Sequence, residues 1–292
     1  MATGIQTNRT SIAPPAEISA EILQKTQEQS AVMQLARQIQ LPGTGSEIPV
    51  ITSDPEAGWV SETGAKPVSN PGLEKKTMTA YKLAVLVPFS NEFQRDLPAL
   101  YDALVERLPG ALAYKFDQTV AGAEGAPGSN FDTFANCETQ NIGGVNTYQA
   151  LVDADADIAK AGGLLNGFAI SPQAKAVLLG AVDGNKRPLF INNVAEGAIP
   201  MILGARTVLS KGVYAHGTDD VVGIAGDWTQ ALYGTVEGVK IDYSTDGTII
   251  TGSGENEQVI SLFQNNMFAV RAEIEIGFVA DTNCFNLLTV TP

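Results

Sequence analysis

The chain lacks the features that membrane-spanning and secreted proteins need. No apolar run reaches the roughly 18 residues that a membrane-spanning helix requires. The N-terminus, Met1 to Gln6, has no basic start followed by an apolar stretch, so it does not resemble a secretory signal. We therefore expect no association with a membrane.

Cysteine and histidine are scarce, which removes most metal and nucleophile chemistry. Cys137 and Cys284 lie far apart in the sequence and neither has a close Cys or His neighbour, so we predict no zinc site. A disulfide between them is an alternative that the sequence leaves undecided. The favoured interpretation is two free, buried thiols in a protein made in a reducing cytosol. His216 is the only histidine, and without a Gly-x-Ser-x-Gly elbow we expect it to be exposed or capping.

Positive charge is also in short supply. The chain has 18 Lys and Arg against 32 Asp and Glu, a formal net charge of -14. Binding to a nucleic-acid backbone needs clustered basic residues, so we expect no sequence-specific nucleic-acid binding. An acidic protein can still enclose DNA, because a container wall does not have to bind its contents. Self-repulsion at this charge means that any assembly depends on specific interfaces.

One acidic run resembles the start of a calcium loop. Asp153, Asp155 and Asp157 alternate as such loops require, but Ile158 stands where a glycine is needed and Leu164 where a glutamate is needed. We interpret the run as acidic residues near a helix N-terminus, where the helix dipole favours them.

No other motif supports a catalytic or cofactor site. The glycine-rich turn at residues 43–46 lacks the lysine of a phosphate-binding loop and precedes a strand. Pairs of carboxylates cannot be singled out among 32 acidic residues. We name no catalytic residue, no metal and no cofactor, and predict that the protein is not an enzyme.

The pattern of apolar residues predicts a folded α+β protein. Its 292 residues are 44% hydrophobic, enough for one large domain or two smaller ones. The clearest helix has apolar residues every three or four positions from Leu97 to Val120, with Asp96 as N-cap and a bend at Pro109. We predict helices over residues 17–40, 97–122, 147–161 and 171–179, and strands over residues 47–52, 77–87 and 268–279.

The order of these elements carries a resemblance to a known family. The segments concerned are Glu47 to Val50 with Gly58 to Glu62, Lys82 to Glu92 with Arg95 and Asp96, Gly167 to Pro172 with Asp183 to Leu189, Gly223 to Trp228, and Val270 to Glu273 with Cys284 to Leu288. In this order they resemble tailed-bacteriophage major capsid proteins of the Hong Kong 97 fold. The resemblance covers nearly the whole chain. The family often has Ala-Phe where this chain has Cys284-Phe285.

The resemblance implies a division of the chain. It implies an N-terminal arm at residues 1–30 and an extended loop at residues 46–82. A peripheral domain would comprise residues 31–45, 83–144 and 258–281, with the 97–122 helix as its spine. An axial domain would comprise residues 145–257 and 282–292.

The resemblance also implies residues that contact neighbouring subunits. Some family members crosslink a lysine of the extended loop to a neighbour's asparagine, but no pair can be mapped here, so we predict no crosslink. The expected inter-subunit contacts are Trp59, Glu62, Lys66, Lys75, Lys76, Arg95, Asp96, Arg271 and Glu273.

The function that follows is a major capsid protein whose copies form hexamers and pentamers of an icosahedral shell around double-stranded DNA. The expected location is the virion capsid, after synthesis in the host bacterial cytoplasm. The expected partners are further copies of the chain, a separate scaffold protein, a portal at one vertex and a decoration protein. An encapsulin, a nanocompartment shell protein of the same fold, is the alternative. An α+β enzyme and another phage structural protein, such as a tail protein, are disfavoured by the missing catalytic motif and by the 97–122 helix respectively.

Overall fold

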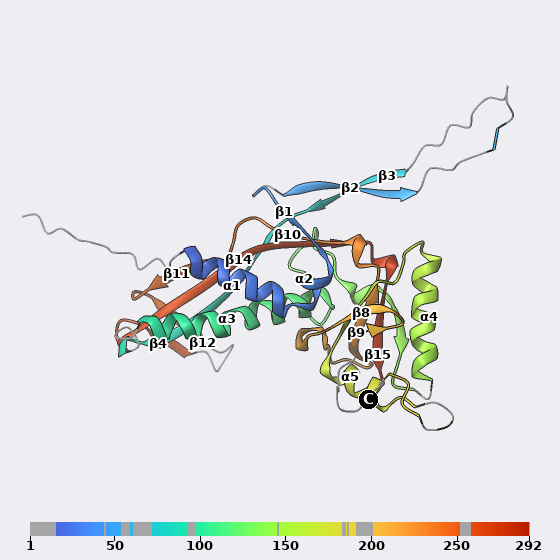
Figure 1. Cartoon of the computed structure of the whole chain (residues 1–292). Coiled ribbons are helices and arrows are strands. Elements are labelled where there is room, and N and C mark those ends of the chain that lie inside the picture. The colour runs from blue at the N-terminus through green and yellow to red at the C-terminus, as the bar shows by residue number, and fades with distance from the viewer. Residues whose placement is uncertain are drawn as a thin grey trace, which may run out of the picture.

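A computed structural model defines the fold. It describes residues 16–43, 45–53, 59–60, 72–92, 97–144, 146–182, 185, 187–190, 201–251 and 258–291. The chain forms two principal sheets with helices packed on them, and a two-stranded hairpin that projects from the body (Figure 1). Within these ranges no helix is both long enough and apolar enough to cross a membrane.

The first sheet is built around one long strand, β14 (Met267–Ala280). β4 (Tyr81–Ser90) pairs antiparallel with β14 over ten residues. β11 (Lys240–Ser244) and β10 (Ala231–Thr235) also pair antiparallel with β14, in successive segments. β1 (Arg37–Gln40) pairs parallel with β10 and completes the sheet.

Two helices cover one face of this sheet, α3 (Leu97–Val120) and α1 (Ala16–Gln29) (Figure 1). α3 has a buried side chain at every fourth position, and β14 has one at every second position. The buried face of the helix and the buried face of the strand therefore contribute to the same hydrophobic core. Full burial of each large apolar side chain stabilises the fold by about 1.5–3 kcal/mol. The buried side chains of the two elements are Leu104, Leu108, Leu112, Phe116 and Val120 of α3, and Phe268, Val270, Ala272, Ile274, Ile276 and Phe278 of β14.

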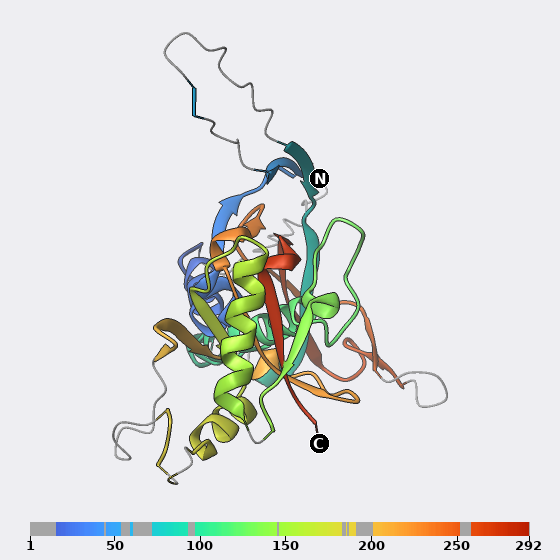
Figure 2. The same ribbon diagram turned by 90° about the vertical axis from the view of Figure 1, so that its right-hand side faces the viewer.

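The second sheet has the strand order β5-β15-β9-β6-β8-β7. Figure 2 shows α4 (Thr147–Lys160), the yellow-green helix, packed against this sheet and running alongside the red strand β15. α5 (Pro172–Gly180) begins at the N-cap Ser171, whose hydroxyl accepts a hydrogen bond from the amide of Ala174. The strands are β5 (Glu138–Asn141), β6 (Gly167–Ile170), β7 (Met201–Ile202), β8 (Ala205–Leu209), β9 (Asp220–Gly226) and β15 (Phe285–Val290).

A cluster of aromatic rings joins the two sheets. Phe134 stacks on Phe285 of β15 with ring centroids 4.4 Å apart, and its edge contacts Phe278 of β14 at 5.6 Å. Trp228 packs edge-on against Phe285 at 5.3 Å. Such pairs add about 0.5–1.5 kcal/mol each to the burial of their area. The two sheets therefore share a continuous core.

Two hairpins stand apart from the principal sheets. β2 (Ser46–Ser53) pairs with β3 (Gly72–Met78), and β12 (Thr248–Thr251) pairs with β13 (Gln258–Ser261). The short helix α2 (Ala31–Leu35) connects α1 to β1.

Most predicted elements are confirmed, and three details are wrong. The helix predicted over residues 17–40 is two helices, α1 and α2, which are separated at Ser30, and residues 37–40 form β1 because they pair with β10. The strand predicted over residues 77–87 is two strands, because β3 pairs with β2 whereas β4 pairs with β14. The acidic run 153–157 lies in the middle and second half of α4, away from its N-terminus. α3 continues through Pro109 as one helix, and the bend predicted there stays a prediction.

Strand pairing departs from the expected domain division at three strands. β10 and β11 fall within the segment 145–257 expected to be axial, yet both pair with β14 of the first sheet. β5 falls within the expected peripheral segment 83–144, yet it pairs with β15 of the second sheet. A strand's sheet is decided by a partner distant in the sequence, so local patterns do not reveal it. The division as a whole stays a prediction.

Candidate subunit-interaction surfaces

The β2–β3 hairpin is fixed at its base. At the base Met78 is completely buried, and Gly45 has a φ of 85°. A Cβ on Gly45 would lie 2.8 Å from the Met78 carbonyl oxygen, so only glycine fits there. Trp59, between the two strands in the sequence, is fully exposed. Large exposed aromatic side chains are frequent energetic centres of protein interfaces.

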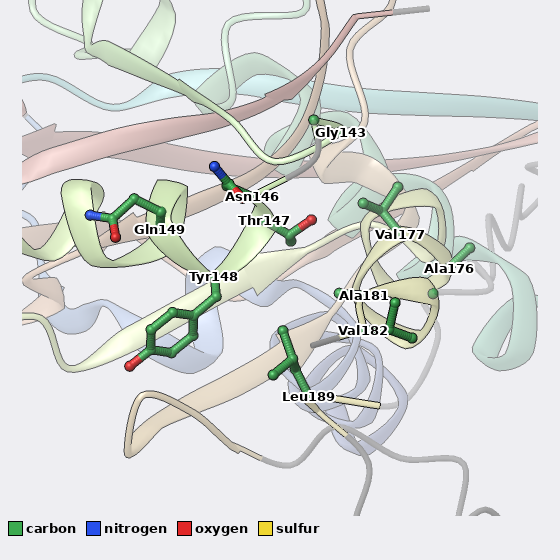
Figure 3. Close-up of a pocket in the computed structure, with 12 residues that line it drawn as sticks. Gly143, Asn146, Thr147, Tyr148, Gln149, Ala176, Val177, Ala181, Val182 and Leu189 are labelled. Atoms are coloured by element: carbon green, nitrogen blue, oxygen red, sulfur yellow. The ribbon is translucent and has the colours of Figure 1, made fainter. Parts of the chain in front are cut away.

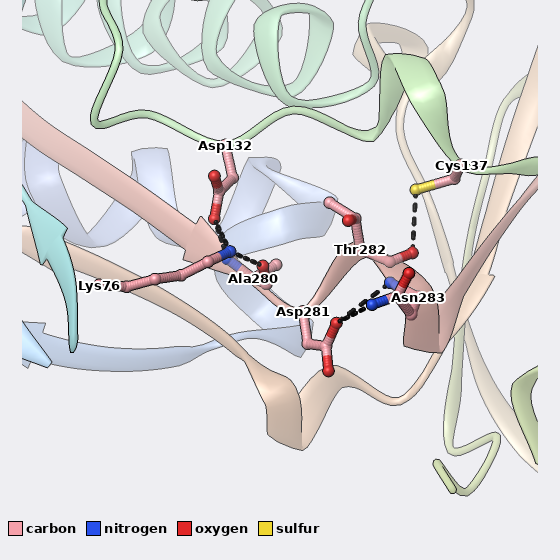
Figure 4. Close-up of polar contacts among 7 residues, drawn as sticks. All are labelled: Lys76, Asp132, Cys137, Ala280, Asp281, Thr282 and Asn283. Carbon is pink, nitrogen blue, oxygen red and sulfur yellow. Dashed lines mark hydrogen bonds and ion pairs between the residues drawn. The ribbon is translucent and has the colours of Figure 1, made fainter. Parts of the chain in front are cut away.

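Lys76 attaches the hairpin to the body of the subunit (Figure 4). Its Nζ donates to Asp132 Oδ2 at 2.8 Å and to the carbonyl oxygen of Ala280 at 2.8 Å. The same Asp132 oxygen accepts from the Ala280 amide at 3.0 Å. Lys75 instead forms an exposed ion pair with Glu47 across the hairpin at 2.7 Å. Of these two candidate contact lysines, Lys76 is therefore committed to its own subunit.

Arg271 and Glu273 lie together on the exposed face of the first sheet. Arg271 Nη2 contacts Asp242 Oδ2 at 2.5 Å, and its Nε lies 3.7 Å from Glu273. Lys82 donates to Glu273 at 2.8 Å and lies 3.3 Å from Glu275. The hydrogen bond from Lys82 lowers the pKa of Glu273 and raises the pKa of Lys82 itself. The face carries alternating charges that pair within the subunit.

A buried carboxylate fixes the N-terminal helices to α3. Asp117 of α3 is completely buried and accepts hydrogen bonds from the Ser30 hydroxyl at 2.5 Å and the Ser210 hydroxyl at 2.6 Å. It also accepts from the amides of Ala31 at 2.9 Å and Val32 at 3.3 Å. Burial raises the pKa of Asp117, and the four hydrogen bonds oppose that rise. Three distant segments therefore meet at one side chain.

A hollow of about 610 Å³ lies between the start of α4 and the end of α5 (Figure 3). Among the described residues, its lining contains no Asp, Glu, Lys, Arg, His or Cys that could form an acid–base or metal-binding set. Half-exposed apolar side chains, among them Tyr148, Val182 and Leu189, line it and suit packing against another protein surface.

The single histidine and the two cysteines are the other side chains that could take part in catalysis or metal binding. His216 is exposed, as predicted, and its Nδ1 lies 2.7 Å from Asp220 Oδ1. Cys137 and Cys284 are free and buried, the favoured interpretation, and burial raises their pKa values to about 12 and about 11. In the part of the chain that the structure describes, no three His, Cys, Asp or Glu side chains gather as a metal site would require.

Four of the nine candidate contacts, Glu62, Lys66, Arg95 and Asp96, lie outside the described residues. The inter-subunit role of all nine stays a prediction. Sequence reasoning missed Asp117 and Asp132, because nothing local separates them from the other acidic residues. The one available signal for Asp117 is its place in the apolar stripe of α3, immediately after the buried Phe116.

The chain is similar to known proteins both in sequence and in structure. A family model described as "Phage capsid family" matches residues 12–289. The "Probable major capsid protein gp17" of Mycobacterium phage L5 is 31% identical over 278 residues, covering 89% of this chain and 84% of that protein. A solved structure from Gordonia phage Cozz superposes with a TM-score of 0.69 at 22% identity, covering 90% of this chain and 87% of that one. A structure titled "Capsid of native GTA particle computed with C5 symmetry" superposes with a TM-score of 0.62 at 16% identity, covering 91% of each chain.

Proposed function

Because this chain belongs to the phage capsid family, we propose that its copies assemble into the hexamers and pentamers of a shell that encloses double-stranded DNA. It is a major capsid protein of the tailed-phage type, with the Hong Kong 97-like α+β fold. Its place is the virion capsid, and we propose synthesis in the cytoplasm of the bacterial host.

The observation that carries the assembly proposal is the β2–β3 hairpin. It is fixed to its own subunit through Lys76 and Met78, while Trp59 is fully exposed. An exposed tryptophan is costly in water and suits a pocket on a neighbouring copy. The hollow beside Tyr148, whose described lining residues carry no charge, offers a second surface for contact between copies. Together these features support association through several separate surfaces of one chain.

The proposed assignment of the two sheets to domains follows the division expected from the sequence, corrected for the observed strand pairing. The first sheet with α3 forms the peripheral part, and the second sheet with α4 and α5 forms the axial part. We propose a separate scaffold protein, a portal at one vertex and a decoration protein as partners. A phage shell is favoured over an encapsulin, because the relatives named above are phage or GTA particle proteins.

Expression of the chain alone and with a phage scaffold protein tests this function. Light scattering and negative-stain microscopy of material purified without denaturant will show hollow particles, or rings of five or six copies. A monodisperse monomer under both conditions would contradict the proposal.

A further inference from the structure

A second hollow, of about 420 Å³, lies where α2 and β1 meet the second sheet. Two of its lining residues are arginines, in a chain whose acidic residues outnumber its basic ones by 32 to 18. The residues that line it are Gln34, Leu35, Arg37, Asn166, Arg206, Trp228 and Thr229.

The bottom of this hollow is rigid. The Trp228 indole is buried, its Nε1 donates to the Gly167 carbonyl at 2.9 Å, and its backbone amide donates to Asn166 Oδ1 at 2.9 Å. Gly167 packs so closely that a Cβ there would lie 2.6 Å from the indole ring. The hollow is thus formed before any ligand arrives, which lowers the entropic cost of binding.

Neither arginine pairs with a carboxylate among the described residues. Arg206 Nη2 donates to the neutral amide oxygen of Gln34 at 3.1 Å, which orients the guanidinium without neutralising it. Within the described part of the chain, Arg37 has no hydrogen bond or ion pair through its side chain. Arg271, in contrast, pairs with Asp242 on the first sheet.

The carboxylate that contacts the lining residues is not available to these arginines. Asp227 is buried, and it accepts from the Thr229 hydroxyl at 2.6 Å, Asn166 Nδ2 at 2.7 Å, and the amides of Leu164 and Thr229 at 3.0 Å. Burial alone raises the pKa of Asp227, but these hydrogen bonds outweigh burial and hold it below its usual range. Four hydrogen bonds from its own subunit therefore hold this carboxylate in place.

We propose that Arg37 and Arg206 bind an acidic side chain of a second copy of this chain, whose carboxylate enters the hollow during assembly. Two guanidinium groups provide several parallel N–H donors, which match the two oxygens of a carboxylate. This inference rests on the proposed shell function and assigns one polar contact within it.

A carboxylate from another copy fits better than a phosphate of DNA. The net charge of -14 repels a polyanion at long range, and the hollow holds two basic residues where backbone binding to DNA needs a row of them. Every copy, in contrast, carries 32 acidic residues. Opposite charges on two copies also favour one relative orientation of the copies over others.

A pair of charge-matched double variants tests the proposal. Arg37→Ala with Arg206→Ala removes the hollow's charge, and Lys175→Ala with Lys211→Ala removes two positive charges elsewhere. We expect the arginine variant to lose at least about tenfold in assembled fraction at low salt and to lose most of its salt dependence, because screening acts on the removed pair. The lysine variant will assemble like the wild type. Equal behaviour of the two variants would overturn the proposal.

Covalent capture identifies the ligand. In Arg206→Lys, a carbodiimide will couple the new amine to any carboxylate in the hollow, and mixing isotope-labelled with unlabelled copies distinguishes links between copies from links within one. We expect a mixed-isotope peptide that joins position 206 to an Asp or Glu, lost when particles are dissociated first. Links within one copy only, no link, or an arginine variant that changes DNA retention without changing assembly would each overturn the proposal. If the wild type never assembles, the shell function itself fails.

Discussion

Lys76 and Asp132 form a 2.8 Å ion pair that joins the base of the β2–β3 hairpin to the end of β14. The pair is only partly exposed, and Ala280 contributes both its carbonyl oxygen and its amide to it. The hairpin is therefore oriented by contacts within its own subunit.

Lys76→Ala will lower the free energy of unfolding by about 1 kcal/mol, because the ion pair and the hydrogen bond to Ala280 are both lost. Limited proteolysis will also cleave the hairpin faster. Lys75→Ala is the matched control, since its pair with Glu47 is exposed, and it will cost less than about 0.5 kcal/mol. Equal effects of the two substitutions in urea unfolding would contradict the role given to Lys76.

Asp117→Asn will destabilise the subunit by about 2–3 kcal/mol. Both carboxylate oxygens accept from backbone amides, so one of those amides must face the NH₂ group of asparagine. Asp246→Asn, at an exposed position, will leave stability within about 0.5 kcal/mol of the wild type. Denaturant unfolding followed by tryptophan fluorescence measures both variants.

The same variant tests how Asp117 titrates. Because burial raises its folded-state pKa, the stability that this carboxyl contributes is fully present below its unfolded value of about 3.9 and is lost as the pH rises through the folded value. The stability of the wild type minus that of Asp117→Asn will therefore shrink as the pH rises from about 4 towards neutrality. A difference that grows with pH would show that the hydrogen bonds, and not burial, dominate the pKa of Asp117.

Cys137 and Cys284 will be inert in the native protein. Their raised pKa values, about 12 and about 11, leave almost no thiolate near neutral pH, and both sulfurs are buried. A chromogenic disulfide reagent will titrate no thiol before unfolding and two afterwards. Rapid reaction of a native thiol, assigned with Cys137→Ala and Cys284→Ala, would contradict the buried placement.

Trp59→Ala will separate assembly from folding. The side chain is fully exposed, so its removal will change the free energy of unfolding by less than about 0.5 kcal/mol. The assembled fraction, measured by size-exclusion chromatography, will fall if the indole is buried against a neighbour, as interface tryptophans typically cost about 2 kcal/mol or more on truncation. An unchanged assembled fraction would remove Trp59 from the set of contacts.

The sequence predicted the elements whose pattern is local. The apolar stripe of α3 and the alternation along β14 follow from burial of one face, and both are confirmed. Residues 37–40 fall within the helix predicted over residues 17–40, and pairing with β10 makes them the strand β1 instead. The separation of β3 from β4 at Thr79 and Ala80 likewise depends on two different partner strands.

Individual site residues were harder to predict for a related reason. A carboxylate such as Asp117 or Asp132 acquires its role from donors 56 or more residues away, and the chain offers 32 acidic candidates. The arginines at 37 and 206 are similarly brought to one hollow by the meeting of β1 and β8 with α2. These arginines stand out because no carboxylate among the described residues pairs with them. The sequence alone cannot predict whether an arginine finds such a partner in the folded chain.

The central claim is that copies of this chain build a closed shell. Cryo-electron microscopy of particles assembled from the purified protein, with scaffold protein where needed, tests it most directly. We predict icosahedral density made of pentamers and hexamers, with the β2–β3 hairpin of each copy lying against a neighbour. Discrete monomers or open aggregates without five-fold vertices, under every assembly condition, would contradict the account.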